Sequence, residues 1–245
     1  MKVFHLPLIV IALFLQTTTW AQTPTQTQTG WFLSLNTIKL GAKTSLHAEF
    51  QLRSSDDFAA TQSLITRVGL NYQTGQRTVL TGGYAYILNR MGAGGVHELL
   101  PEHRLWQQLV IHQPVVTTSL MHRFRLEERW IPKTIMDNGN LEIDERLFSM
   151  RLRYFARMIV PLQKAKSFSK GMFLTLQDEV FANVVNSVNV NGKIFDQNRA
   201  YIALGYRLSK KCDIELGYLN QFISTKEPSP NVMNHAFQLA VYSRL

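Results

Sequence analysis

Residues 211–223 read KCDIELGYLNQFI, and apolar and polar side chains alternate along them. Alternation with a period of two residues is typical of a β-strand whose two faces meet different environments. A helical spacing of the apolar residues fits this stretch less well. One face carries Ile214, Leu216, Tyr218 and Phe222, and the other carries Asp213, Glu215, Gly217 and Gln221.

The same alternation recurs along the rest of the chain. In residues 119–131, SLMHRFRLEERWI, every second residue from Arg123 to Arg129 is charged. Residues 43–53 and 62–73 alternate in the same way. The candidate strands cover residues 30–39, 43–53, 62–73, 77–89, 102–112, 119–131, 144–159, 170–181, 195–208, 211–223 and 233–245.

The length of these segments separates a membrane barrel from a soluble sheet. Most of them have 11 to 14 residues, whereas strands of soluble sheets have about 5 to 6. A tilted strand that crosses a membrane needs about 9 to 11 residues. A soluble lipocalin-like barrel would alternate too, but so many long strands would enclose far more room than a cup of about eight strands. We therefore predict an all-β fold, an antiparallel transmembrane β-barrel.

The number of strands does not fit a simple rule. The segments number eleven, but single-chain bacterial barrels normally have an even number of strands. We expect about twelve strands, within a range of about 10 to 12. Residues 25–29 would supply a short twelfth strand, unless one segment is split or missed.

The links between the segments alternate between short and long. Short turns follow the first, third and ninth segments. Long links rich in Gly, Pro and Asn follow the fourth, sixth, eighth and tenth, at residues 90–101, 132–143, 183–194 and 224–232. Outer-membrane barrels have short turns on the periplasmic side and long loops outside the cell.

The first 21 residues have the features of a cleaved export signal. Lys2 precedes an apolar stretch that ends at Leu15, and Thr19-Trp20-Ala21 offers a cleavage site after Ala21. The apolar stretch is too short for a membrane-spanning helix, which needs about 20 residues. We expect a signal peptide at 1–21, a flexible Thr/Gln-rich leader at 22–29 and an outer-membrane β-barrel at 30–245.

Charge and cysteine content narrow the range of partners. The formal net charge is +9, but the basic residues are dispersed and form no block, so no nucleic-acid partner is expected. Cys212 is the only cysteine, which excludes an intrachain disulfide framework. The expected partners are outer-membrane lipid and, during insertion, the machinery that assembles barrels. The sequence leaves the solute and any extracellular partner open, and it predicts no cofactor and no metal site.

Five stretches carry a resemblance to a known family: residues 30–32 (GWF), 102–108 (EHRLWQQ), 122–130 (HRFRLEERW), 195–201 (FDQNRAY) and 216–221 (LGYLNQ). Through them the chain resembles outer-membrane barrel proteins of the Bacteroidota that are catalogued as a domain of unknown function. The resemblance covers nearly all of the chain after residue 21. It implies a barrel fold and no particular activity, because none is established for the family as a whole.

A set of charged residues falls on the presumed inner face of the barrel. An Arg or Lys that faced lipid at mid-depth would cost about 2 to 4 kcal/mol. One interpretation is a paired network that fills the lumen and holds the strands in register, and the other is an Arg-rich constriction that selects anions. The set comprises Glu49, Arg53, Arg67, Arg104, Arg123, Arg125, Glu127, Arg129, Arg151, Arg153, Glu179, Arg199, Arg207 and Glu215.

The alternative function is a barrel hydrolase that acts on lipid, of the phospholipase or lipid-A deacylase type. His103, His112, His122 and His235 lie in candidate strands, and Ser119 and Ser149 are possible nucleophiles. A triad needs Ser, His and an orienting Asp or Asn in contact, and the chain has no G-x-S-x-G elbow. We therefore expect a structural barrel or a passive small-solute pore, and no enzyme.

Two further groups of residues have simple structural interpretations. Residues 137–140 (DNGN) lack the spacing of a calcium loop, so they predict a solvated turn. Six aromatic residues are expected to anchor the barrel at the membrane interfaces. These are Trp106, Trp130, Tyr84, Tyr86, Tyr218 and Phe222.

Overall fold

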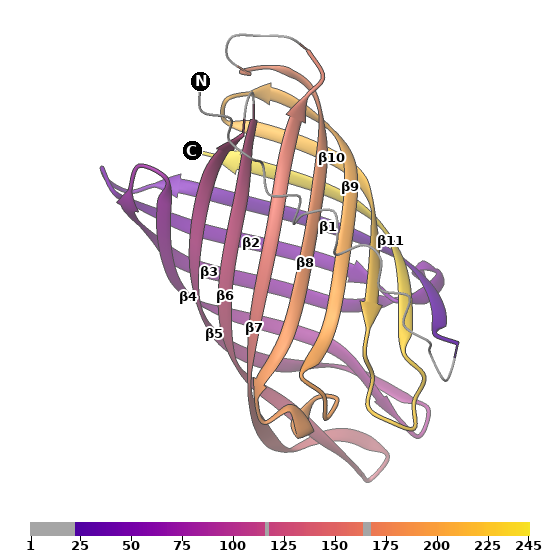
Figure 1. Cartoon of the computed structure of the whole chain (residues 1–245). Coiled ribbons are helices and arrows are strands. Elements are labelled where there is room, and N and C mark those ends of the chain that lie inside the picture. Colours follow the sequence, from indigo (N-terminus) through magenta and orange to yellow (C-terminus); the bar gives the residue numbers. More distant parts are fainter. Residues whose placement is uncertain (1–22, 116–117, 164–167) are drawn as a thin grey trace.

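The computed structural model describes residues 23–115, 118–163 and 168–245. These residues form one closed β-barrel, and Figure 1 shows the strands of its front wall crossing those of the back wall obliquely, as tilted barrel strands do. The strands are β1 (Thr25–Lys39), β2 (Thr44–Ser54), β3 (Thr61–Gly75), β4 (Thr78–Ala93), β5 (Val96–Val115), β6 (Thr118–Asp137), β7 (Asn140–Pro161), β8 (Gly171–Val185), β9 (Phe195–Ser209), β10 (Cys212–Ile223) and β11 (Val232–Arg244). Two short 3-10 turns, η3 (Asp56–Phe58) and η4 (Ser187–Asn189), lie in links between them.

The barrel closes through a parallel pair of strands. Each strand pairs antiparallel with its neighbours in the chain, and β1 pairs parallel with β11, from Thr25 opposite Val232 to Thr37 opposite Arg244. The eleven predicted segments are confirmed, but the expectation of twelve strands and of purely antiparallel pairing is wrong. An odd number of alternating strands leaves the first and the last running in the same direction, so only a parallel pair can close the ring.

The boundary of the barrel also differs from the prediction. β1 begins at Thr25, so residues 25–29 are neither a flexible leader nor a separate strand but the first part of β1. The hydroxyls of Thr27 and Thr29 both donate to Oδ1 of Asn234 on β11, at 3.2 and 3.0 Å. These two threonines, whose polarity suggests a flexible leader, therefore form hydrogen bonds inside the barrel. The predicted signal peptide, residues 1–21, lies outside the described residues.

Two of the four predicted long links are not loops, because the strands on either side continue through them to a tight turn. Residues 90–101 form a hairpin in which β4 and β5 stay paired as far as Ala93 and Val96. The turn residues Gly94 and Gly95 have φ values of 57° and 85°, which favour glycine. Residues 132–143 behave in the same way, with Asn138-Gly139 as the turn, and the links at 183–194 and 224–232 contain the loops β8–β9 and β10–β11.

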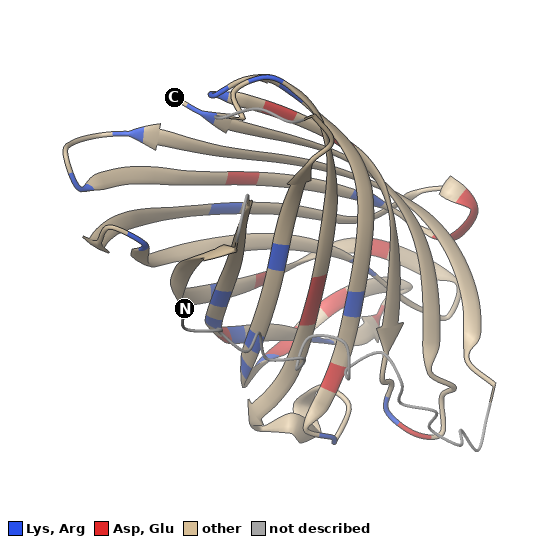
Figure 2. Ribbon diagram, turned by 45° about the horizontal axis from the view of Figure 1, so that its top comes forward, with Lys and Arg blue, Asp and Glu red and all other residues tan. Residues whose placement is uncertain are grey.

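Side chains divide between an apolar outer face and a charged inner face. Along β3, Val68 and Leu70 lie on the outer face and are 46% and 53% exposed. Arg67 of the same strand lies on the inner face and is 4% exposed. Figure 2 shows blue and red bands along the lengths of the strands and not only at their ends. Among the described residues, no helix is long and apolar enough to cross a membrane. With apolar side chains on the outside and charged side chains on the inside, the barrel has the inverse of the burial pattern of a soluble protein.

The prediction that Trp106 anchors the barrel at a membrane interface is wrong. Its side chain is 1% exposed, and it lies on the inner face of β5 with Arg104 and Gln108. Gly69 and Gly83 face each other on β3 and β4, and the indole ring occupies the space that their missing side chains leave. Tyr84 and Tyr86, in contrast, are each 39% exposed on the outer face. The two glycines thus permit a large ring inside the wall, where a β-carbon would exclude it.

Replacing Gly83 with alanine tests this packing. A β-carbon at Gly83 would clash with the carbonyl oxygen of Val68 and lie 2.6 Å from Cζ2 of Trp106, so both the strand backbone and the indole must shift. We expect Gly83→Ala to lower the free energy of unfolding by about 1–3 kcal/mol, the usual cost of overpacking. The measurement is urea unfolding in detergent micelles, followed by tryptophan fluorescence.

The adjacent glycine provides the matched control. A β-carbon at Gly82 would meet nothing within 4 Å, so Gly82→Ala should leave the free energy of unfolding almost unchanged or raise it slightly. Equal losses from the two substitutions would contradict the packing of Trp106 against Gly83.

Candidate functional site

The lumen brings the predicted charged residues together. Alternation along the strands turns every second side chain inward, and a closed sheet directs these side chains toward one another. Arg53, Arg123 and Arg207 are partly buried. The other eleven residues of the predicted set are each at most 9% exposed: Glu49, Arg67, Arg104, Arg125, Glu127, Arg129, Arg151, Arg153, Glu179, Arg199 and Glu215.

Glu127 is the centre of the ion-pair network. Its carboxylate accepts from Arg151 at 2.7 Å, from Arg153 at 2.5 Å and from Arg104 at 3.3 Å. These partners come from β7 and β5, on either side of the strand that carries Glu127. The glutamate is 1% exposed. One carboxylate therefore ties three adjacent strands together by charge-assisted hydrogen bonds.

Glu179 forms a second centre on β8. It accepts from Arg153 at 2.7 Å and from Arg123 at 2.8 Å, and Arg199 lies 3.9 Å away. Arg153 bridges Glu127 and Glu179, so the two centres belong to one network. Arg67 pairs with Glu49 on the opposite wall. Glu127 and Glu179 thus each contact more than one arginine, and Glu49 pairs closely with Arg67.

The lumen contains five charged, ion-paired residues that are missing from the predicted set: Glu102, Arg157, Asp196, Asp213 and Arg244. Glu102 accepts from Arg104 and Arg129, both at 2.7 Å. It lies two residues before Arg104, so its parity places it on the same face. Arg157 and Asp213 follow the same rule with respect to Arg153 and Glu215.

Asp196 could not be found by parity. It pairs with Arg151 at 2.7 Å and is 4% exposed. A bulge interrupts the register between β8 and β9, where Phe195 and Gln197 lie opposite Ala182 and Phe181. Asp196 is therefore the extra residue, and a bulge turns such a residue away from regular alternation.

Two buried arginines form no ion pair with any carboxylate of the described residues. Arg53 donates to Oε1 of Gln51 at 2.6 Å, and its guanidinium lies 3.9 Å from the ring centre of Trp31. Arg125 donates to Gln108 and lies 4.6 Å from the ring centre of Trp106. Within the described residues, twelve arginines and seven acids face the lumen. The lumen therefore carries an excess of positive charge.

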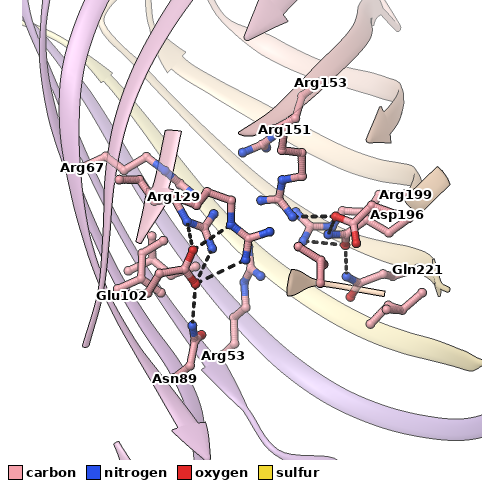
Figure 3. Close-up of a pocket in the computed structure, with 16 residues that line it drawn as sticks. Arg53, Arg67, Asn89, Glu102, Arg129, Arg151, Arg153, Asp196, Arg199 and Gln221 are labelled. Atoms are coloured by element: carbon pink, nitrogen blue, oxygen red, sulfur yellow. Dashed lines mark hydrogen bonds and ion pairs between the residues drawn. The ribbon is translucent and has the colours of Figure 1, made fainter. Parts of the chain in front are cut away.

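The arginines divide the lumen into two chambers. The loop-end chamber, about 240 Å³, includes Asn89, Val190 and Ile223 in its wall, close to the longer links. The turn-end chamber, about 740 Å³, includes Thr37, Lys210 and Arg244, close to the short turns. Figure 3 shows the loop-end chamber with the Glu102 pairs on one side and the Arg151–Asp196 pair on the other.

Three residues line both chambers: Arg53, Arg153 and Arg199. We call these three residues the arginine layer. Arg53 and Arg199 both lie over the ring of Trp31, at 3.9 and 5.2 Å from its centre. Arg153 is held by Glu127 and Glu179. Within the layer, Arg153 is thus firmly paired with acids, whereas Arg53 and Arg199 rest mainly on an aromatic ring.

The hydrolase candidates do not form a triad. Histidines on the outer face contact tyrosines instead: Tyr84 lies 2.5 Å from His103, Tyr154 lies 2.9 Å from His122 and Tyr218 lies 2.5 Å from His235. Ser149 is buried and donates to the carbonyl of Val185. Across the described ranges, no serine hydroxyl is hydrogen-bonded to a histidine ring, and no group of His, Cys, Asp and Glu could hold a metal ion.

Removing Glu127 should weaken the barrel. Glu127→Ala leaves three buried arginines without their shared carboxylate, and breaking a buried pair in this way costs about 3–5 kcal/mol. We expect the urea midpoint of the variant to fall well below that of the wild type.

Glu145 on β7 is the control, because it pairs with Lys133 at 2.6 Å but is half exposed. Glu145→Ala should be close to neutral. Equal stabilities of Glu127→Ala and the wild type would mean that water screens the lumen arginines and that the network does not hold the fold.

Comparisons with known proteins identify a family for this chain but no activity. An uncharacterized protein of Methylorubrum extorquens is 26% identical over 217 residues, which cover 86% of each chain. No solved structure matches the chain. The model of a family described as a protein of unknown function, DUF2490, matches residues 28–233. The resemblance predicted from the five sequence stretches is therefore confirmed at the level of the family, and the chain belongs to the DUF2490 family.

Proposed function

We propose that this protein is an outer-membrane β-barrel whose narrow lumen passes small anions. The observation that carries the proposal is the arginine layer, Arg53, Arg153 and Arg199, which lies between the two chambers. Two members of the layer are not held closely by acids, so the boundary between the two chambers offers positive charge to a passing solute.

The outer surface supports the membrane part of the proposal. Large apolar side chains such as Leu70, Leu204 and Leu216 are 53%, 54% and 66% exposed on the outer faces of their strands. Exposed apolar area on this scale would be unfavourable in water and is favourable against lipid. A closed barrel also leaves no strand edge unpaired, which lipid requires. The predicted signal peptide provides a route for export.

The balance of charge supports selection of anions. Twelve arginines against seven acids leave a positive potential in the lumen, and low-dielectric walls strengthen that potential. A lumen filled only to hold the strands together would be expected to match its charges. Two of the weakly paired arginines, Arg53 and Arg199, lie between the two chambers, which favours a conducting role over a purely structural one.

The asymmetry of the ends supports an orientation. The paired hairpins β4–β5 and β6–β7 and the loops at 183–194 and 224–232 lie at one end, and the tight turns such as Lys210-Lys211 lie at the other. In outer-membrane barrels the longer connections are extracellular. The loop-end chamber would then open toward the outside and the turn-end chamber toward the periplasm.

Cell fractionation tests the location. The mature protein should be recovered in the outer membrane, and its migration on a gel should change on heating because a folded barrel resists detergent unfolding. A known outer-membrane barrel of the same cells serves as the reference. Recovery in the soluble periplasmic fraction would overturn the proposal.

Planar-bilayer recording tests the selectivity. In a gradient of potassium chloride, the reversal potential of the wild type should indicate anion preference. The double variant Arg53→Gln/Arg199→Gln should shift that potential toward zero, because it removes the two weakly paired charges of the arginine layer.

Arg146→Gln removes an exposed arginine, bonded only to the carbonyl of Pro101, and should not change the reversal potential. A wild type that passes no ions, or that prefers cations, would contradict anion conduction.

A further inference from the structure

The loop-end chamber has the composition of an anion-binding site. Its wall holds seven arginines and two acids. Its volume of about 240 Å³ suits a small solute and not a chain molecule. The arginines come from both sides of the lumen, as Figure 3 shows, so they surround the space. They are Arg53, Arg67, Arg104, Arg129, Arg151, Arg153 and Arg199.

Several arginines of this chamber have a buried donor without a partner. Four of its arginines each have one buried nitrogen with no hydrogen-bond partner among the described residues: Nε of Arg53, Nε of Arg67, Nη1 of Arg129 and Nε of Arg199. Three of these side chains, those of Arg67, Arg129 and Arg199, are at most 9% exposed. A buried charged donor without an acceptor is unfavourable. The described residues therefore supply these four nitrogens with no acceptors.

The neighbouring acids cannot supply them. Glu102 already accepts from Arg104, Arg129 and Asn89. Asp196 accepts from Arg151 and Gln197. Both carboxylates of the chamber already hold an arginine, and neither accepts from the four unpartnered nitrogens, which leaves these donors open to an acceptor from outside the chain.

We propose that the loop-end chamber binds a small tetrahedral oxyanion, a phosphate or sulfate group, free or carried on a small molecule. The arginine side chains that carry the unpartnered donors come from four strands, β2, β3, β6 and β9, and so reach the chamber from different parts of its wall. A tetrahedral group offers oxygens in all of these directions, whereas a planar carboxylate engages one guanidinium edge well. The inference rests on the proposed function only in that solutes enter the lumen.

Isothermal titration calorimetry tests the site on the full-length mature barrel in detergent. The ligands are inorganic phosphate, sulfate and glycerol 3-phosphate, with acetate and chloride at the same ionic strength as comparisons. We expect at least one tetrahedral oxyanion to bind more tightly than acetate and chloride. Glycerol 3-phosphate binding more tightly than inorganic phosphate would identify a phosphate monoester as the source of the group, and the reverse order would identify the free ion.

The variant Arg53→Gln should weaken oxyanion binding by about tenfold or more, the effect of losing one charge-assisted hydrogen bond. Arg53 forms no ion pair, so its loss leaves no carboxylate unpaired among the described residues. Arg125→Gln is the matched control, because Arg125 is also buried without an acid partner but lines only the turn-end chamber. Heat-modifiable migration of each variant checks that it has folded, and Arg53→Lys retains the charge if Arg53→Gln does not fold.

Several results would overturn the inference. These are the absence of binding by any of the three oxyanions, binding of acetate as tight as that of phosphate, or equal weakening by Arg53→Gln and Arg125→Gln. Calorimetry in detergent does not depend on conduction. Phosphate binding without anion current would therefore contradict the proposed passage alone, and anion current without phosphate binding would contradict this site alone.

Discussion

A guanidinium group inside the barrel has left bulk water, and it needs a carboxylate, an amide oxygen or an aromatic face to offset that loss. Glu127 meets the need for Arg104, Arg151 and Arg153 at once, because β6 lies between β5 and β7 and every second residue points inward. Arg153 then reaches Glu179 on β8, so the compensation extends around the wall. A shift of one residue in the register of β6 would turn Glu127 outward and leave these arginines unpaired. The register of the sheet and the pairing of charge therefore depend on each other.

Local alternation is enough to predict the strands, since each strand carries its own pattern of inward and outward side chains. It also predicts the inner-face positions of Arg123, Arg125, Glu127 and Arg129, and parity from Arg104 and Glu215 would have added Glu102 and Asp213. The same parity places Trp106 inside, although an aromatic residue in a strand predicted to cross a membrane first suggests the interface. Composition is therefore a weaker guide than position along the strand.

Features that depend on partners elsewhere in the chain could not be read from local pattern. The parallel closure of β1 on β11 is a property of the whole ring, and the threonines of residues 25–29 look like a leader until Asn234 is opposite them. Asp196 faces inward because of a bulge against β8. The separation of the lumen into two chambers depends on which long side chains meet across it, and strands far apart in sequence supply them.

The choice of arginine explains how the lumen keeps more positive charge than it neutralises. A guanidinium is planar and weakly hydrated, so it can rest on an aromatic ring where an ammonium would require a close acceptor. Trp31 supports Arg53 and Arg199, and Trp106 supports Arg125, in places where no described carboxylate pairs closely with these groups. Aromatic rings stabilise the guanidinium face but leave its N–H edges free to donate. Stacking therefore holds arginines in the lumen without using up their donors, and this combination of a stable fold with free donors is what the proposed anion site requires.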